Sequence, residues 1–83
     1  MTPTEVKQAA DEMVANWMIL LVQSLPFISY ASIDNPILVA THFAIAHYKR
    51  VIEVLELSTP GTYTNYLFKK HRLILSELEG RVK

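Results

Sequence analysis

The chain has 83 residues, and its eight Lys and Arg residues balance eight Asp and Glu residues, so the formal net charge is zero. A neutral chain has no electrostatic field to steer DNA, RNA or an anionic membrane towards it, so we expect no nucleic-acid partner and no membrane. The sequence contains no cysteine, which excludes disulfides and cysteine-based zinc sites.

Hydrophobic residues make up 51% of the sequence and charged residues only 19%, against about 25% in a typical domain. A chain this short forms one domain and buries only about 60% of its unfolded surface, so its own core is thin. We therefore expect a single all-α domain over residues 1–83, completed by oligomerisation, most simply as a homodimer.

Three helices are predicted by a polar residue followed by proline. Proline is favoured at the first position of a helix, and Ser, Thr, Asn or Asp is favoured just before it as the cap. The three pairs are Thr2-Pro3, Asn35-Pro36 and Thr59-Pro60. They predict helices over roughly residues 3–25, 36–57 and 60–79, arranged up-down-up with the shallow crossing angles of a helical bundle.

The first predicted helix opens with a capping box, because Glu5 stands three residues after Thr2, and Pro26 is expected to stop it. Its apolar stripe consists of Val6, Ala10, Met13, Trp17 and Leu21. From Trp17 to Val22 the helix is apolar on every side, which is typical of a central helix or of one covered by a partner.

The stretch from Met13 to Ile33 contains no Asp, Glu, Lys or Arg. Asn, Gln, Ser and Pro residues interrupt it, so we interpret it as a buried helix followed by a loop, not as a membrane span of about 20 apolar residues. Residues 27–33 are rich in apolar and aromatic side chains, but a short segment between prolines favours a loop over a strand. Since no basic leader opens the chain, we expect a cytoplasmic protein.

The second predicted helix carries a polar stripe and two apolar faces. The polar stripe consists of His42, Lys49, Glu53 and Glu56. The opposite face carries Ala40, Ala44, His47, Val51 and Val54. A further apolar row, formed by Leu38, Ile45 and Ile52, is spaced by seven residues and forms a short heptad seam with Tyr48.

Two apolar faces leave two alternatives, a wide face buried within the domain or a second contact with another molecule. One helix of a three-helix monomer rarely needs two such faces. We therefore expect an interface at Leu38, Ile45, Tyr48 and Ile52, with Trp17 of the first helix.

The third predicted helix presents one apolar face and a short basic run. Its face consists of Tyr63, Leu67, His71, Ile74 and Leu78, and Gly80 is expected to end the helix. The helical spacing turns Lys69 and Arg72 outward but His71 inward, so the run predicts a solvated face and not a phosphate contact.

Two histidines lie within apolar stripes. The short connection between the second and third helices predicts an antiparallel hairpin, which places His47 and His71 at the same level, with Glu12 or Asn16 as a candidate third polar member. Three interpretations remain open: core histidines with satisfied hydrogen bonds, a buried polar network, or a zinc or iron site. Burial of both imidazoles would lower their pKa values.

The sequence contains no recognisable catalytic motif. No serine stands in a strand–turn–helix elbow, and Gly61 and Gly80 cannot form a phosphate-binding loop. We expect no enzyme, no cofactor and no metal, but a protein–protein interaction or assembly module of the kind common in phage and mobile elements. The alternative is a small-molecule or metal-binding bundle that uses His47 and His71.

Overall fold

The computed structural model describes residues 1–24 and 35–83, which form three helices and no strand. The helices are α1 (Pro3–Ser24), α2 (Pro36–Leu57) and α3 (Thr62–Arg81). The predicted all-α class is confirmed. The predictions for Leu25, Pro26 and residues 27–33 lie outside the described residues.

The first two helices begin where the sequence predicts. The Thr2 hydroxyl accepts from the backbone N–H of Glu5 at 3.2 Å, and the Glu5 carboxylate accepts from the N–H of Thr2 at 3.1 Å. This reciprocal pair is a capping box. At α2, the Asn35 side chain accepts from the N–H of Leu38 at 3.1 Å. Asn35 has φ 122°, in the region that Asn tolerates better than most residues.

The predicted start and end of the third helix are wrong. The helix begins at Thr62, with Gly61 at the cap position, so Thr59 caps nothing. Ser58 already has an extended backbone, and the residue before a proline is also disfavoured in the helical region, so the third helix does not begin before Gly61. At the other end Gly80 has no positive φ, and the helix continues through it to Arg81.

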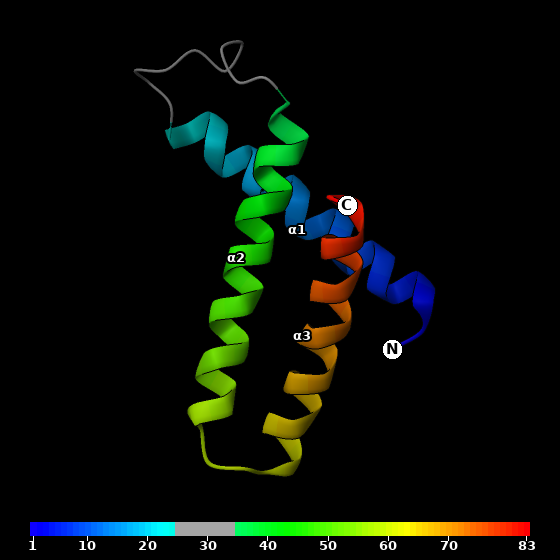
Figure 1. Cartoon of the computed structure of the whole chain (residues 1–83), viewed down its shortest axis with the longest axis vertical. Helices are drawn as coiled ribbons and strands as arrows, with labels where there is room; N and C mark the ends of the chain where they lie inside the picture. The colour runs from blue at the N-terminus through cyan, green and yellow to red at the C-terminus, as the bar shows by residue number, and fades with distance from the viewer. Residues whose placement is uncertain (25–34) are drawn as a thin grey trace.

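α2 and α3 form the predicted antiparallel hairpin, but α1 does not complete an up-down-up bundle. Figure 1 shows α1 running obliquely across the α2–α3 pair, near the open end of the hairpin. Three alanines of the core, Ala10 of α1 and Ala40 and Ala44 of α2, are 0% exposed. Small side chains let the two helices approach closely where they cross, and larger side chains of α1 on either side of Ala10 pack against the same core.

The core lies where α1 crosses the hairpin. Its buried members are Ala10, Val14, Ala40, Ala44, Ile45, Tyr48, Ile74 and Leu78. Every residue of the stripe predicted for the first helix is buried or packs against this cluster. Ile74 and Leu78 are the largest fully buried side chains among the described residues, which confirms the inner half of the face predicted for α3.

Arg81, at the end of α3, joins that helix to α1. Its guanidinium lies 2.7 Å from the Asp11 carboxylate and 3.2 Å from the Glu77 carboxylate. It also donates to the backbone carbonyl of Lys7 at 3.4 Å. These contacts fix the first half of α1 beside the last turns of α3.

None of the helices within residues 1–24 and 35–83 combines the length and apolarity that a membrane span requires.

Candidate interaction surface

The apolar row predicted to face a partner lies mostly inside the chain. Ile45, Tyr48 and Ile52 are buried, Tyr48 with only 6% of its surface exposed. α2 packs against both α1 and α3, so it buries two adjacent flanks and needs a wide apolar face. Of the two alternatives left open by the sequence, the structure places this row as part of a wide buried face. In α2, Leu38 alone of the row remains partly exposed.

Trp17, the fifth residue of the predicted interface, is also engaged within the chain. It is partly buried and packs against the core. Its indole stacks on Phe43 of α2, with ring centroids 5.3 Å apart and an interplanar angle of 15°. Sequence reasoning overlooked Phe43, although it stands one helical turn before His47 and therefore lies on the flank of α2 that faces α1.

The last turns of α1 are apolar on every side, yet the helix packs on one side only. Ile19 is 56% exposed, and Leu20 and Val22 are exposed to a similar extent. α1 is therefore not a central helix. Its far side presents apolar side chains that no described residue covers.

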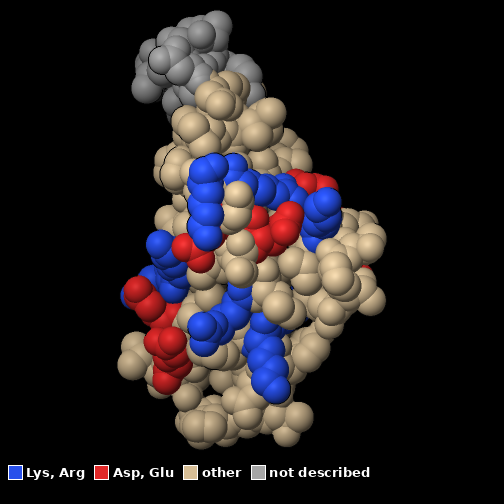
Figure 2. Space-filling view, turned by 45° about the vertical axis from the view of Figure 1, so that its right-hand side comes forward, with Lys and Arg blue, Asp and Glu red and all other residues tan. Residues whose placement is uncertain are grey.

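The first turns of α2 add further exposed apolar side chains at the same end of the molecule (Figure 1). We call these exposed side chains together the apolar end, and define it as Ile19, Leu20, Val22, Ile37, Leu38 and Phe43, which lie on more than one side of the two helices. Figure 2 shows the surface next to the grey atoms without Lys, Arg, Asp or Glu, whereas a band of charged residues crosses the middle of that face.

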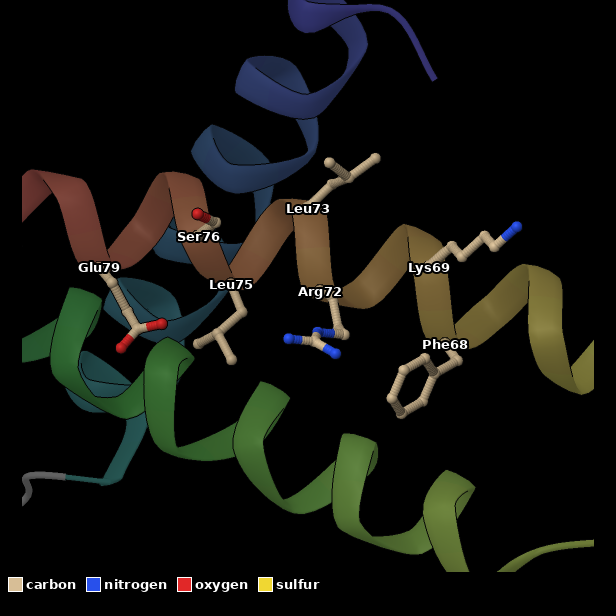
Figure 3. Close-up of a pocket in the computed structure, with 7 residues that line it drawn as sticks. All are labelled: Phe68, Lys69, Arg72, Leu73, Leu75, Ser76 and Glu79. Atoms are coloured by element: carbon tan, nitrogen blue, oxygen red, sulfur yellow. The ribbon is translucent and has the colours of Figure 1, made fainter.

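One open hollow lies elsewhere, on α3, and has a volume of about 700 Å³. All of its lining residues come from that one helix: Phe68, Lys69, Arg72, Leu73, Leu75, Ser76 and Glu79. Figure 3 shows Phe68 and Leu75 on one side of the helix and Leu73 on the other. Arg72 lies over the Phe68 ring, 5.5 Å from its centroid. This is an open helix face, and it does not enclose a small molecule.

The two histidines flank one tyrosine. The Tyr48 ring lies 5.6 Å from the His47 ring and 5.3 Å from the His71 ring, and both contacts are edge-to-face. The two imidazoles are thus at the same level, as predicted, but Tyr48 occupies the space between them. The prediction that both point inward is wrong for His47, which is exposed because the buried flank of α2 is centred on Ala44 and Tyr48.

His71 is the partly buried member of the pair. Its Nδ1 atom is buried and has no hydrogen-bond partner among residues 1–24 and 35–83. Burial lowers the pKa of His71, and the nearby charges of Lys70 and His47 lower it further. The predicted direction is therefore confirmed for this imidazole.

The histidine pair does not assemble a metal centre in the described part of the chain. Glu12 and Asn16, the candidate third members, are exposed. No three His, Asp or Glu side chains of the described residues lie close enough together to share an ion.

No protein-family model, no curated protein and no solved structure matches this chain. Its function is therefore argued from its own surfaces.

Proposed function

We propose that this protein is a small helical assembly module that binds a second copy of itself through the apolar end. One observation carries the proposal: the last turns of α1 are apolar all round, but only one side of them is packed. Exposed apolar surface at one end of a small domain is typical of a binding surface. The thin core of so short a chain favours completion by a partner in the same way.

The size of the apolar end fits a dimer. Its six partly exposed side chains present on the order of 500 Å² of apolar surface. A standard interface takes about 800 Å² from each partner, of which about 60% is apolar. The apolar end therefore supplies about the apolar area that one partner contributes.

The lack of charged side chains in the apolar end favours a second copy of the chain as the partner. In a two-fold dimer the same patch meets itself, so any charge on it meets a like charge. The segment from Met13 to Ile33 contains no Asp, Glu, Lys or Arg, and none of the apolar-end residues of α2 is charged. The six side chains of the apolar end therefore bring no like charges together, while Asp34 directly precedes the cap of α2 in the sequence.

The proposal is tested by the mass of the protein in solution and by one substitution in the apolar end. We expect sedimentation equilibrium at high micromolar concentration to give twice the chain mass of 9.5 kDa. Leu20→Glu should return the chain to 9.5 kDa with its helical circular dichroism unchanged, because Leu20 is about half-exposed in the monomer. A buried glutamate pair would make the dimer unfavourable.

The matched control is Leu57→Glu, the same change at a leucine of α2 that is 88% exposed and far from the apolar end. This variant should remain a dimer. A wild-type chain that is monomeric at high micromolar concentration overturns the proposal. A dimer that survives Leu20→Glu but is lost in Leu57→Glu rejects the apolar end as the interface.

A further inference from the structure

An unbroken series of ring contacts crosses all three helices, from the apolar end to the core. It begins at Phe43, which stacks on Trp17, and Trp17 lies 6.3 Å from the His47 ring. His47 contacts Tyr48, and Tyr48 contacts His71 at 5.3 Å. The series therefore ends at His71, a titratable ring that packs against the core residue Tyr48 of α2.

The surroundings of the Nδ1 atom of His71 make protonation of this ring unfavourable in the folded chain. A neutral imidazole carries a proton on one nitrogen only, whereas the charged ring donates from both nitrogens. Protonation therefore places an N–H at Nδ1, which is buried and has no acceptor within the described residues. A buried donor without a partner is costly, and a buried charge more so.

The charged and titratable groups around His71 do not offset that cost. On α2 they are His47 and the phenol of Tyr48, and on α3 the neighbouring group is the cation Lys70. On α1, the charge of Glu5 interacts with that of Lys70, but Glu5 does not contribute to the shift in the pKa of His71. The two charges that act on His71 are thus positive when ionised, and both oppose its protonation.

We propose that His71 is an acid-sensitive latch, whose protonation loosens the packing of α3 against α2 and thereby releases the second copy from the apolar end. The first half of this inference concerns the single chain. The second half rests on the proposed function, because the apolar end is assembled from α1 and α2 only while the three helices remain packed.

The sign of the pH dependence follows from the burial of the imidazole. The pKa of His71 is lowered in the folded chain, so the unfolded chain takes up the proton first as the pH falls. The stabilising effect of the neutral ring is complete above the unfolded pKa of about 6.5. It is lost progressively as the pH falls from there towards the lower folded pKa.

The first test uses the monomeric Leu20→Glu variant, so that association does not enter. Trp17 is the one tryptophan of the sequence, and its fluorescence follows urea unfolding at pH 8 and at pH 5. In that background His71→Phe keeps a ring beside Tyr48 but cannot titrate, and His47→Phe is the matched control at the exposed imidazole. We expect the urea midpoint to fall on acidification in the parent and in the His47→Phe chain, and to fall clearly less in the His71→Phe chain.

Equal falls in the parent and in the His71→Phe chain overturn the latch. If His71→Phe does not fold, the imidazole resonances of the parent are titrated by NMR instead, with the exposed His42 as the reference. A His71 midpoint below that of His42 supports the latch, and a midpoint at or above it overturns the latch.

The second test is sedimentation of the wild type at both pH values. The latch predicts dimer at pH 8 and a larger monomer fraction at pH 5, with the difference reduced in His71→Phe. A dimer equally stable at both pH values overturns the release of the partner. A chain that is monomeric at both values rejects the proposed function, while the urea comparison still decides the latch.

Discussion

The α2–α3 hairpin has two halves that differ in what covers them. We call residues 36–48 and 71–81 the covered half, because α1 crosses them, and residues 49–58 and 61–70 the tip half. In the covered half Ala44, Ile74 and Leu78 are fully or almost fully buried. In the tip half burial is confined to the seam between the two helices, where Ile52 lies, and Leu57 is among the large side chains left exposed.

One apolar stripe of α3 crosses both halves and shows what α1 contributes to burial. Tyr63 and Leu78 belong to the same helical face of α3, yet Leu78 is fully buried and Tyr63 is 71% exposed. Tyr63 stands in the first turn of α3, at the tip of the hairpin, and Leu78 stands near the other end, where α1 crosses (Figure 1), so the difference follows the position of α1 along the helix. Two helices alone bury a seam, and a third is needed to bury a face.

The largest predicted difference is between two leucines. Leu78→Ala, in the covered half, should lower the free energy of unfolding by about 2–5 kcal/mol, because it leaves a cavity in the core. Leu57→Ala, in the tip half, should change it by less than about 0.5 kcal/mol, because the side chain is already in solvent. Urea unfolding at one protein concentration measures both. Similar losses at the two positions would show that the tip half is covered in solution.

The helix caps of the two halves should differ by a smaller amount. Asn35→Ala removes the bond to the N–H of Leu38 and should cost about 1 kcal/mol. Asn35→Gly should cost less, because glycine adopts the positive φ of this position freely. Thr59→Ala, at the turn of the tip half, should cost less than about 0.5 kcal/mol, because Thr59 caps no helix. Thermal unfolding ranks the three variants, and a Thr59 effect as large as that of Asn35 would contradict the observed start of α3.

The smallest expected difference concerns two arginines. Arg81 joins α1 to the covered half, so Arg81→Ala should cost up to about 1 kcal/mol, and less at high salt. Arg50 in the tip half pairs with Glu53 of its own helix and with no other acid among residues 1–24 and 35–83, and both side chains are mostly exposed. Arg50→Ala should therefore have an effect near zero. Urea midpoints at low and high salt distinguish the two, and equal salt dependence would remove Arg81 as a link between the helices.

The sequence predicted what depends on local chemistry. Two of the three helix starts follow from a cap and a proline, and the buried residues of α1 and α3 follow from their helical spacing. Thr59-Pro60 failed because the same pair also fits an extended connection, and only the backbone at Ser58 distinguishes the two.

The candidate site was harder to predict, because periodicity assigns residues to faces of a helix but does not say from where a neighbour approaches. Ile45 and Ile52 were placed on a second face of α2, whereas α3 packs on that face and α1 packs beside it. His47 and His71 were placed at the right level, but the rotation of α2 that exposes His47 is set by tertiary packing. The all-round apolar end of α1 was visible in the sequence, and the oblique crossing decided that it is exposed.

The three alanines buried at the crossing set how closely α1 lies against α2. Val22 stands twelve residues beyond Ala10, which is about 18 Å along a helix. A turn of about 10° at that contact would move Val22 by about 3 Å, and Trp17, Met18 and Leu21, which pack against the core in between, would have to shift with it. Enlarging Ala10 or Ala44 would wedge the layers apart and re-aim the far end of α1 without altering a single residue there. The direction of the last turns of α1, and with it the apolar surface at that end, would therefore change with the volume of the side chains buried at the crossing.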